Sequence, residues 1–237
     1  MPCTNCDCPF QEIRALSEPD LPSNKRCMLN GSVQGVTFKH GEILFMQGQP
    51  SSCLFAISDG TVKICTHNAD GREQIVGISG PHSLLVGLQS LNHDRYAYSA
   101  IAASDVRACR INHRALLETL RDRGDLAIRL IEVMTAQLAH SRALMEVLGH
   151  KCAAAKIASF LLLITPVSKK YNGNFELPFS RLEIASLLGL SEETVCRLMA
   201  SMRREGAIHA PRGRLEIRDW GRLHSIADGK SGINISH

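Results

Sequence analysis

Three cysteines lie within the first eight residues of the chain, in the stretch MPCTNCDCPF. Cys3, Cys6 and Cys8 could form disulfides, hold a metal centre, or have no chemical role. Thiolate sulfur is a ligand for zinc and for iron–sulfur clusters, and closely spaced cysteines can reach the same centre. The choice among these alternatives depends on the compartment in which the protein works.

That compartment is predicted from what the chain does not contain. The longest apolar stretch, residues 157–167, has 11 residues, whereas a membrane-spanning helix needs about 20. The N-terminus has no basic segment followed by an apolar run, so no secretory signal is predicted. We therefore expect a cytoplasmic protein with no membrane partner, in which thiols stay reduced.

The chain has nine cysteines in all. An odd and unevenly spaced set is a poor disulfide framework. We expect the scattered Cys53, Cys65 and Cys152 to be small buried apolar residues. The N-terminal cysteines are better candidates for metal or redox ligation.

A second stretch, FSRLEIASLLGLSEETVCRLMASMRREGAI, contains the side chains expected to contact DNA. Ser180 followed by Glu183 is a capping box that begins one helix. Gly189 marks a break, and Ser191 is placed to cap a second helix. Two short helices joined by a glycine turn predict a helix-turn-helix.

The second helix of such a motif lies in the major groove with its N-terminal residues facing the bases. Glu193, Cys196 and Arg197 share one face of it. Arg197 can donate two hydrogen bonds to guanine, and Glu193 can accept one from cytosine. The alternatives are that Glu193 only stabilises the helix end and that Arg197 is only solvated. The role of Cys196 stays open.

Basic residues surround this element. Residues 150–222 hold 12 Lys and Arg against 7 Asp and Glu, whereas the remainder holds 15 against 16. A basic part on a nearly neutral body indicates a polyanionic partner. Ser191 and Arg203 are expected DNA contacts, and Arg204, Arg212 and Arg214 would contact phosphates or remain exposed.

The elements that must position these residues follow from periodicity. Residues 35–124 have short apolar runs separated by glycine turns, including an Asp-Gly hairpin signal, and predict an antiparallel β-roll. Residues 125–149 predict one long helix with a stripe whose positions step by three and four, as in a dimerisation seam. The stripe is apolar except at Ser141, and its positions are Ile131, Met134, Leu138, Ser141, Met145 and Leu148. Residues 150–225 complete a winged helix-turn-helix domain, and residues 1–34 form a cysteine-bearing N-terminal segment.

This arrangement resembles the CRP/FNR family of transcription regulators over residues 38–220. The most specific segments are FKHGEILFMQGQPSSCLFAISDGTVKI and GLSEETVCRLM. The resemblance implies an α+β fold with a cyclic-nucleotide-binding-like roll, and a homodimer on palindromic double-stranded DNA with TTGAT-like half-sites. It also implies RNA polymerase as a partner at the promoter. Family members of the FNR type usually have Ser where this chain has Cys196, which affects the outer base of the half-site.

The family resemblance also bears on the signal. Cyclic-AMP binders use a Gly-Glu pair and an Arg-Ser pair, but no Glu follows Gly87 here and Tyr-Ala-Tyr follows Arg95. FNR-type oxygen sensors hold a 4Fe–4S cluster with three N-terminal cysteines and one cysteine of the roll. By this resemblance the ligands would be Cys3, Cys6, Cys8 and Cys109. Cys8 follows Cys6 after one residue, unlike the usual longer spacing, so Cys27 is the rival third ligand and zinc a rival metal.

Three functions are therefore compatible with this chain to different degrees. The first is a redox- or oxygen-responsive transcription regulator that binds DNA when its iron–sulfur cluster is intact, with nitric oxide as a second signal. The second is a family member that senses haem-bound gas through His82, His93 or His140, a small molecule, or thiol oxidation. The third, an enzyme, is disfavoured because the chain has no nucleophile-elbow, P-loop or zinc-protease motif.

Overall fold

The computed structural model describes residues 33–67, 73–81, 85–87, 94–150, 152–165, 170–171, 174–211 and 213–230. The chain divides into two compact units, one reaching to Leu138 apart from Gln74–Gly77, and the other formed by those four residues and the chain from Ala139 onward. Cys3, Cys6, Cys8, Cys27, His82 and His93 lie outside the described residues. Among the described helices, none has the length and hydropathy needed to cross a bilayer.

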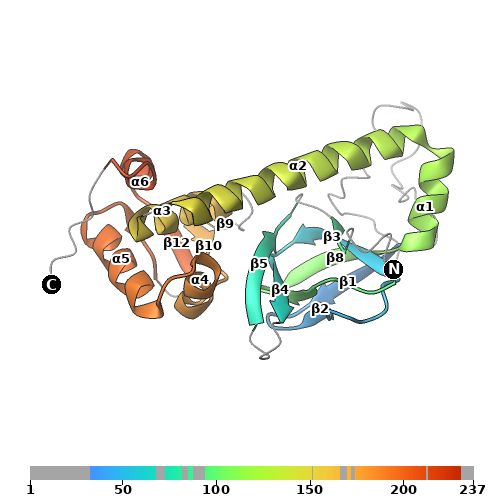
Figure 1. The fold of residues 1–237 in the computed structure, drawn as a ribbon, viewed down its shortest axis with the longest axis horizontal. Helices are drawn as coiled ribbons and strands as arrows, with labels where there is room; N and C mark the ends of the chain where they lie inside the picture. The colour runs from blue at the N-terminus through green and yellow to red at the C-terminus, as the bar shows by residue number, and fades with distance from the viewer. Residues whose placement is uncertain are drawn as a thin grey trace. The chain divides into compact units, whose positions relative to one another are not determined.

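The N-terminal unit is a β-roll of two antiparallel sheets (Figure 1). One sheet has the order β1-β8-β3-β6 and the other β2-β7-β4-β5. The strands are β1 (Val33–Phe38), β2 (Ile43–Phe45), β3 (Cys53–Asp59), β4 (Val62–His67), β5 (Glu73–Ser79), β6 (Leu85–Val86), β7 (Ser99–Ala102) and β8 (Val106–Asn112). The predicted α+β fold with a β-roll is confirmed.

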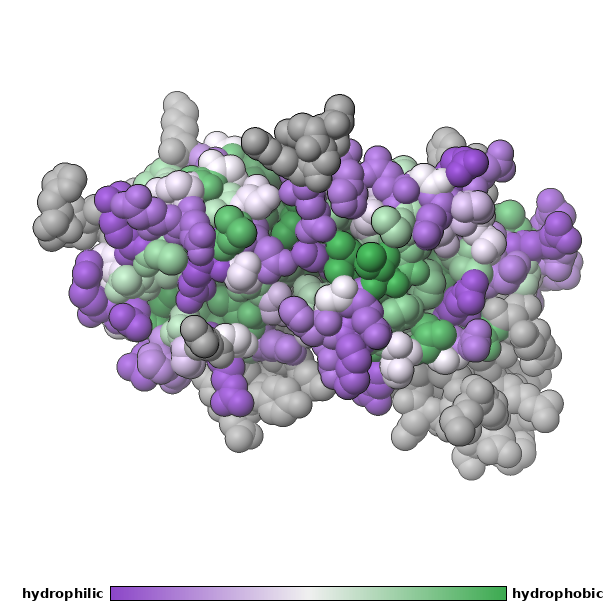
Figure 2. Space-filling model, turned by 90° about the horizontal axis from the view of Figure 1, so that it is seen from below, coloured by the Kyte–Doolittle hydropathy of each residue, from purple (hydrophilic) through white to green (hydrophobic). Residues whose placement is uncertain are grey.

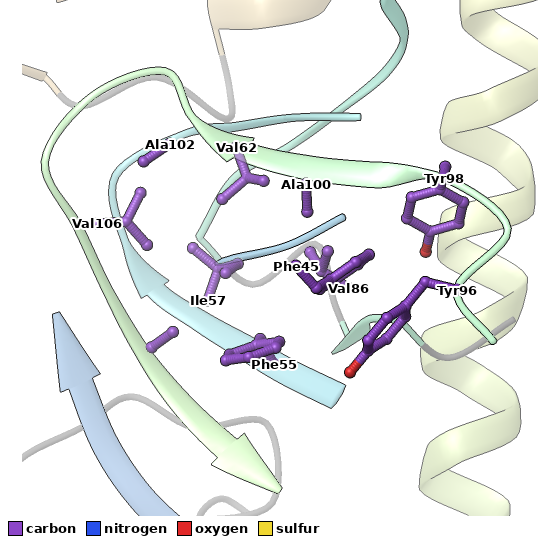
Figure 3. Close-up of a cluster of buried hydrophobic side chains, with 11 residues drawn as sticks. Phe45, Phe55, Ile57, Val62, Val86, Tyr96, Tyr98, Ala100, Ala102 and Val106 are labelled. Carbon is purple, nitrogen blue, oxygen red and sulfur yellow. The ribbon is translucent and has the colours of Figure 1, made fainter. Parts of the chain in front are cut away.

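Aromatic and aliphatic side chains together fill the interior of the roll (Figure 3). The rings of Phe45 and Tyr96 stack with centroids 3.9 Å apart, and Tyr98 lies 5.6 Å from Phe45. The Tyr98 hydroxyl accepts a 3.0 Å hydrogen bond from the backbone N–H of Gly87. Because a buried hydroxyl needs a partner, this bond lets a tyrosine occupy an apolar core.

Removal of the Tyr98 hydroxyl should destabilise the roll. Tyr98→Phe keeps the ring but leaves the buried Gly87 N–H without its acceptor, at a cost of about 1–3 kcal/mol in the free energy of unfolding. Burial raises the pKa of Tyr98 from 10.0 to about 12, so its contribution is complete below pH 10 and is lost as the pH rises toward 12. Urea unfolding at pH 8 and at increasing pH measures both effects. An unchanged midpoint and pH profile in the variant would contradict this role.

Two helices follow the roll. The first, α1 (His113–Asp122), begins at Asn112, whose side chain accepts hydrogen bonds from the N–H groups of Arg114 and Ala115. The second, α2 (Gly124–Gly149), is the long helix that the three-and-four stripe predicted, and it ends at the expected glycine. Its stripe residues are exposed: 63% for Ile131, 49% for Met134, 51% for Leu138, 61% for Met145 and 39% for Leu148.

The C-terminal unit contains helices α3 (Ala153–Ile164), α4 (Arg181–Leu188), α5 (Glu192–Arg204) and α6 (Trp220–Ala227). A small antiparallel sheet has the order β11-β12-β10-β9, from strands Ile208–His209, Arg214–Ile217, Asn174–Glu176 and Lys170–Tyr171. Helix α3 packs on α5 and α6, so it forms the centre of the unit. On the face drawn in Figure 2, apolar residues show as separate patches among hydrophilic ones.

Candidate nucleic-acid interface

Helix α4 begins with the capping box that the sequence predicted. The Ser180 Oγ accepts a 3.1 Å hydrogen bond from the Glu183 N–H, and the Ser180 N–H donates to the Glu183 carboxylate at 2.9 Å. These two bonds satisfy backbone donors that the helix itself cannot. They fix where α4 begins, while Ile184 and Leu188 anchor its inner face.

The turn between α4 and α5 depends on Gly189. Its φ is 64° and its ψ 41°, the left-handed conformation that ends many helices and that glycine adopts without steric cost. Helix α5 then begins at Ser191, whose Oγ accepts from the Thr194 N–H at 3.2 Å. The turn and cap together set the crossing of α4 and α5, which pack against each other.

Helix α5 has one buried face and one exposed face. Val195, Leu198, Met199, Ser201 and Met202 are buried, whereas Cys196 and Arg197 between them are exposed. Glu193, Cys196 and Arg197 are all exposed on the outer face. The structure therefore brings these three predicted contact residues together, close to the N-terminal end of the helix.

Glu193 and Arg197 form a loose ion pair. The Arg197 Nη1 lies 3.9 Å from the Glu193 Oε1, and the side chains are 53% and 82% exposed. An exposed pair of this kind contributes little to stability. It does hold the guanidinium over the outer face of α5, from which Arg197 can exchange its partner for the edge of a base.

The remaining predicted contacts lie around this face. Arg203 and Arg204 are exposed in the last turn of α5, and Arg214 is exposed in β12 of the wing. The Ser191 hydroxyl caps α5 and also lies 2.8 Å from the Thr194 hydroxyl, so it is engaged within the protein. Arg212 lies outside the described residues.

Sequence reasoning missed Arg181, the first residue of α4. Burial lowers the pKa of Arg181, and the electrostatic influence of Cys196 opposes that shift. The two groups therefore influence each other electrostatically, although 15 positions separate them in the sequence. The available signal was a basic residue directly after the helix cap, where a first-turn side chain of α4 can reach across to α5.

Two family models match the chain. A cyclic nucleotide-binding domain matches residues 35–123, and a Crp-like helix-turn-helix domain matches residues 155–226. The transcriptional activator protein Anr of Pseudomonas aeruginosa is 32% identical over 200 residues, which cover 83% of this chain and 82% of that protein. The chain belongs to the CRP/FNR family of transcription regulators.

Further CRP/FNR relatives agree with this. The transcriptional activator protein FnrL of Cereibacter sphaeroides is 27% identical over 241 residues, covering 97% of this chain and 94% of that protein. The structure of FixK2 from Bradyrhizobium japonicum superposes with a TM-score of 0.72 at 25% identity, and covers 82% of this chain and 96% of that one. The predicted family and architecture are thus confirmed.

Two polar groups in the roll of this CRP/FNR regulator, at Gly87 and Arg95, are hydrogen-bonded within the protein. The Gly87 N–H is bonded to the Tyr98 hydroxyl at 3.0 Å. The Arg95 guanidinium donates to the Gly48 carbonyl at 2.6 Å. Both of these donors therefore have partners inside the protein.

Cys109 lies in β8 of the roll and is 3% exposed. Its partner across the β1–β8 ladder is Gly35. Paired residues of a ladder project to the same face of the sheet, and a Cβ built on Gly35 would meet no atom of the described residues within 4 Å. At this position, β1 therefore contributes no side chain beside the Cys109 thiol. Among the described residues, no group of three or more His, Cys, Asp or Glu could hold a metal ion.

Proposed function

We propose that this regulator binds palindromic DNA with TTGAT-like half-sites as a homodimer when a 4Fe–4S cluster is intact, and that oxygen or a redox signal removes the cluster. The observation that carries the proposal is the thiol of Cys109, buried in β8 beside the space that Gly35 leaves open. Thiolates are the usual ligands of such clusters. Cys3, Cys6 and Cys8 would supply the other three.

The dimer is supported by the apolar stripe of α2. Ile131, Met134, Leu138, Met145 and Leu148 recur at steps of three and four and are all exposed. Apolar residues at this spacing pack against the same stripe of a second helix. Ser141, the single polar position of the stripe, weakens that packing and so makes the association adjustable.

A charge in the stripe should separate the subunits. In Leu138→Asp, each subunit loses a leucine that the dimer would bury and gains a carboxylate that the dimer would desolvate. Dimerisation should therefore weaken by at least about 2 kcal/mol. Sedimentation velocity at micromolar concentration measures the monomer fraction. Ala139→Asp adds the same charge one residue on, outside the stripe, and should remain dimeric. Equal dissociation of both variants would contradict the proposed seam.

The iron–sulfur proposal is tested by the visible absorption of protein purified without oxygen. A broad shoulder that bleaches in air is expected for an iron–sulfur cluster. A sharp Soret band would favour the second candidate function, a gas sensor in which His140 or another histidine ligates haem. A colourless protein would contradict both cofactors. As a regulator of transcription, the protein should bind DNA with an affinity that falls as the salt concentration rises, and it should not convert the DNA to a product.

A further inference from the structure

A cavity of about 410 Å³ opens between the last turns of α2 and helix α3. Its lining residues begin at His140 and end at Leu163, so all of them belong to the C-terminal unit. The volume falls within the range of about 300–1,000 Å³ that is typical of small-molecule sites. The groups that line the cavity therefore decide what kind of molecule it could hold.

Apolar side chains form the walls of the cavity on both sides. Val147 of α2 is 4% exposed, and Leu162 and Leu163 of α3 are partly buried. Ala143 also lines the α2 wall, where its small side chain adds little bulk. A ligand with an apolar body would remove these surfaces from water, which favours binding.

The polar groups of the cavity are two imidazoles, one hydroxyl and one carboxylate. The His150 Nε2 lies 3.2 Å from the Ser159 Oγ, so these two side chains are already paired with each other. Burial lowers the pKa of His140, so its imidazole is neutral at neutral pH. Among the described residues that line the cavity, Glu146 is the only Asp, Glu, Lys or Arg, and it is exposed.

Charges just outside the cavity cancel one another. The Asp228 carboxylate pairs with the Lys230 ammonium at 2.8 Å. The pKa of Asp228 is lowered mainly by Lys230, with smaller contributions from His224 and His150, so this pair lies within electrostatic reach of the cavity. Because the pair carries no net charge, the carboxylate of Glu146 sets the sign of the charge that a ligand would meet.

The cavity is on a side of α2 that the proposed dimer does not use. His140, Ala143 and Val147 recur at steps of three and four, so they share one face of the helix. At 3.6 residues per turn, this face is roughly 130° around the helix from Met145 and Leu148 of the apolar stripe. The stripe can therefore pair with a second helix while the face that lines the cavity stays accessible.

We propose that this cavity binds a small amphipathic organic cation, with an apolar body and one ammonium or guanidinium group. The apolar body would lie against Val147, Leu162 and Leu163, and the cationic group would donate to the Glu146 carboxylate. Helix α3 packs on α5 and α6, so the ligand would contact the central helix of the DNA-binding unit. The proposal does not depend on an iron–sulfur cluster, because no cysteine is among the described residues that line the cavity.

The test is a calorimetric titration of the full chain with phenethylammonium chloride at about pH 7.5. Hydrocinnamate has a similar aromatic body and the opposite charge, and methylammonium has the charge without the aromatic body. We expect one saturable site per chain for phenethylammonium. Its affinity should exceed that of hydrocinnamate by about tenfold, because an exposed carboxylate changes each affinity by about threefold in opposite directions. Methylammonium should not saturate the site.

Two variants test the role of the carboxylate. Glu146→Gln removes the charge at an exposed position, so the fold should persist while the affinity for phenethylammonium falls about threefold and the preference over hydrocinnamate disappears. Glu132→Gln is the matched control on the same helix. Glu132 pairs with Arg129 at 2.7 Å and does not line the cavity, so this variant should keep both the affinity and the preference.

Two further variants test the cavity itself. Ala143→Leu fills space at the α2 wall and should weaken binding of phenethylammonium by at least about tenfold. Ala136→Leu adds the same bulk at an exposed position two turns earlier on α2 and should leave binding unchanged. The proposal would be overturned if the wild type showed no saturable binding of phenethylammonium or bound hydrocinnamate or methylammonium equally well. It would also be overturned by a charge preference that survives in Glu146→Gln, or by unchanged binding in Ala143→Leu.

Discussion

Arg197→Ala is expected to weaken operator binding by about 1–3 kcal/mol and to relax selectivity at one base pair of each half-site. Arg197 is on the outer face of α5, near its N-terminal end, and its only described ion-pair partner is the loosely held Glu193. Truncation removes the two donors that match guanine O6 and N7 without touching the buried face of the helix. The loss should therefore be largest for the preferred sequence and small for sequences altered at that base.

Arg203→Ala is the matched control for this prediction. Arg203 is exposed at the last turn of α5, where a phosphate contact is expected. Its loss should weaken binding to all DNA sequences alike. The number of counterions released on binding, read from the slope of affinity against salt concentration, should fall by about one. Fluorescence anisotropy on a panel of half-site variants at several salt concentrations measures both effects. If Arg197→Ala also weakened every sequence equally, Arg197 would not read a base.

Cys109→Ser is expected to abolish retention of the cluster while the fold survives. Serine has nearly the same size, so the buried position in β8 stays filled, but its hydroxyl is a poor ligand for iron. Only the three N-terminal thiolates would then remain. Iron and acid-labile sulfide per chain, measured after anaerobic purification, should fall from about four of each toward zero.

Cys152→Ser is the corresponding control, because Cys152 lies at the N-cap of α3 in the other unit. It is exposed there, so the expectation that it is buried like Cys53 and Cys65 was wrong. The variant should keep the full iron and sulfide content. Cys8→Ser and Cys27→Ser then decide which of the two is the third N-terminal ligand. An unchanged content in Cys109→Ser would show that the roll does not supply a ligand.

The helix-turn-helix could be predicted from the sequence because its signals are local. Ser180 and Glu183 are three residues apart, and Ser191 caps the helix that directly follows it. The same holds for the long helix, whose stripe is a repeat within one element. Such features need no knowledge of which distant segments meet.

Other features could not be predicted because they depend on distant pairing. The Arg110–Cys53 contact joins residues 57 positions apart, and it exists only because β3 and β8 are neighbours in register. The stacking of Phe45 on Tyr96 likewise requires the roll to be closed. Helices α1 and α6 are short, and no local signal in the sequence predicted them. The N-terminal cysteines lie outside the described residues, so their assignment stays a prediction.

In the proposed function, an inorganic centre held jointly by the N-terminal segment and the roll controls DNA binding. This control is tested most directly by the affinity of anaerobically purified protein for a palindromic TTGAT-like duplex, before and after brief exposure to air. We expect tight binding at first and a loss of affinity of at least about tenfold in air, in step with the loss of iron. Equal affinity in both states would contradict it.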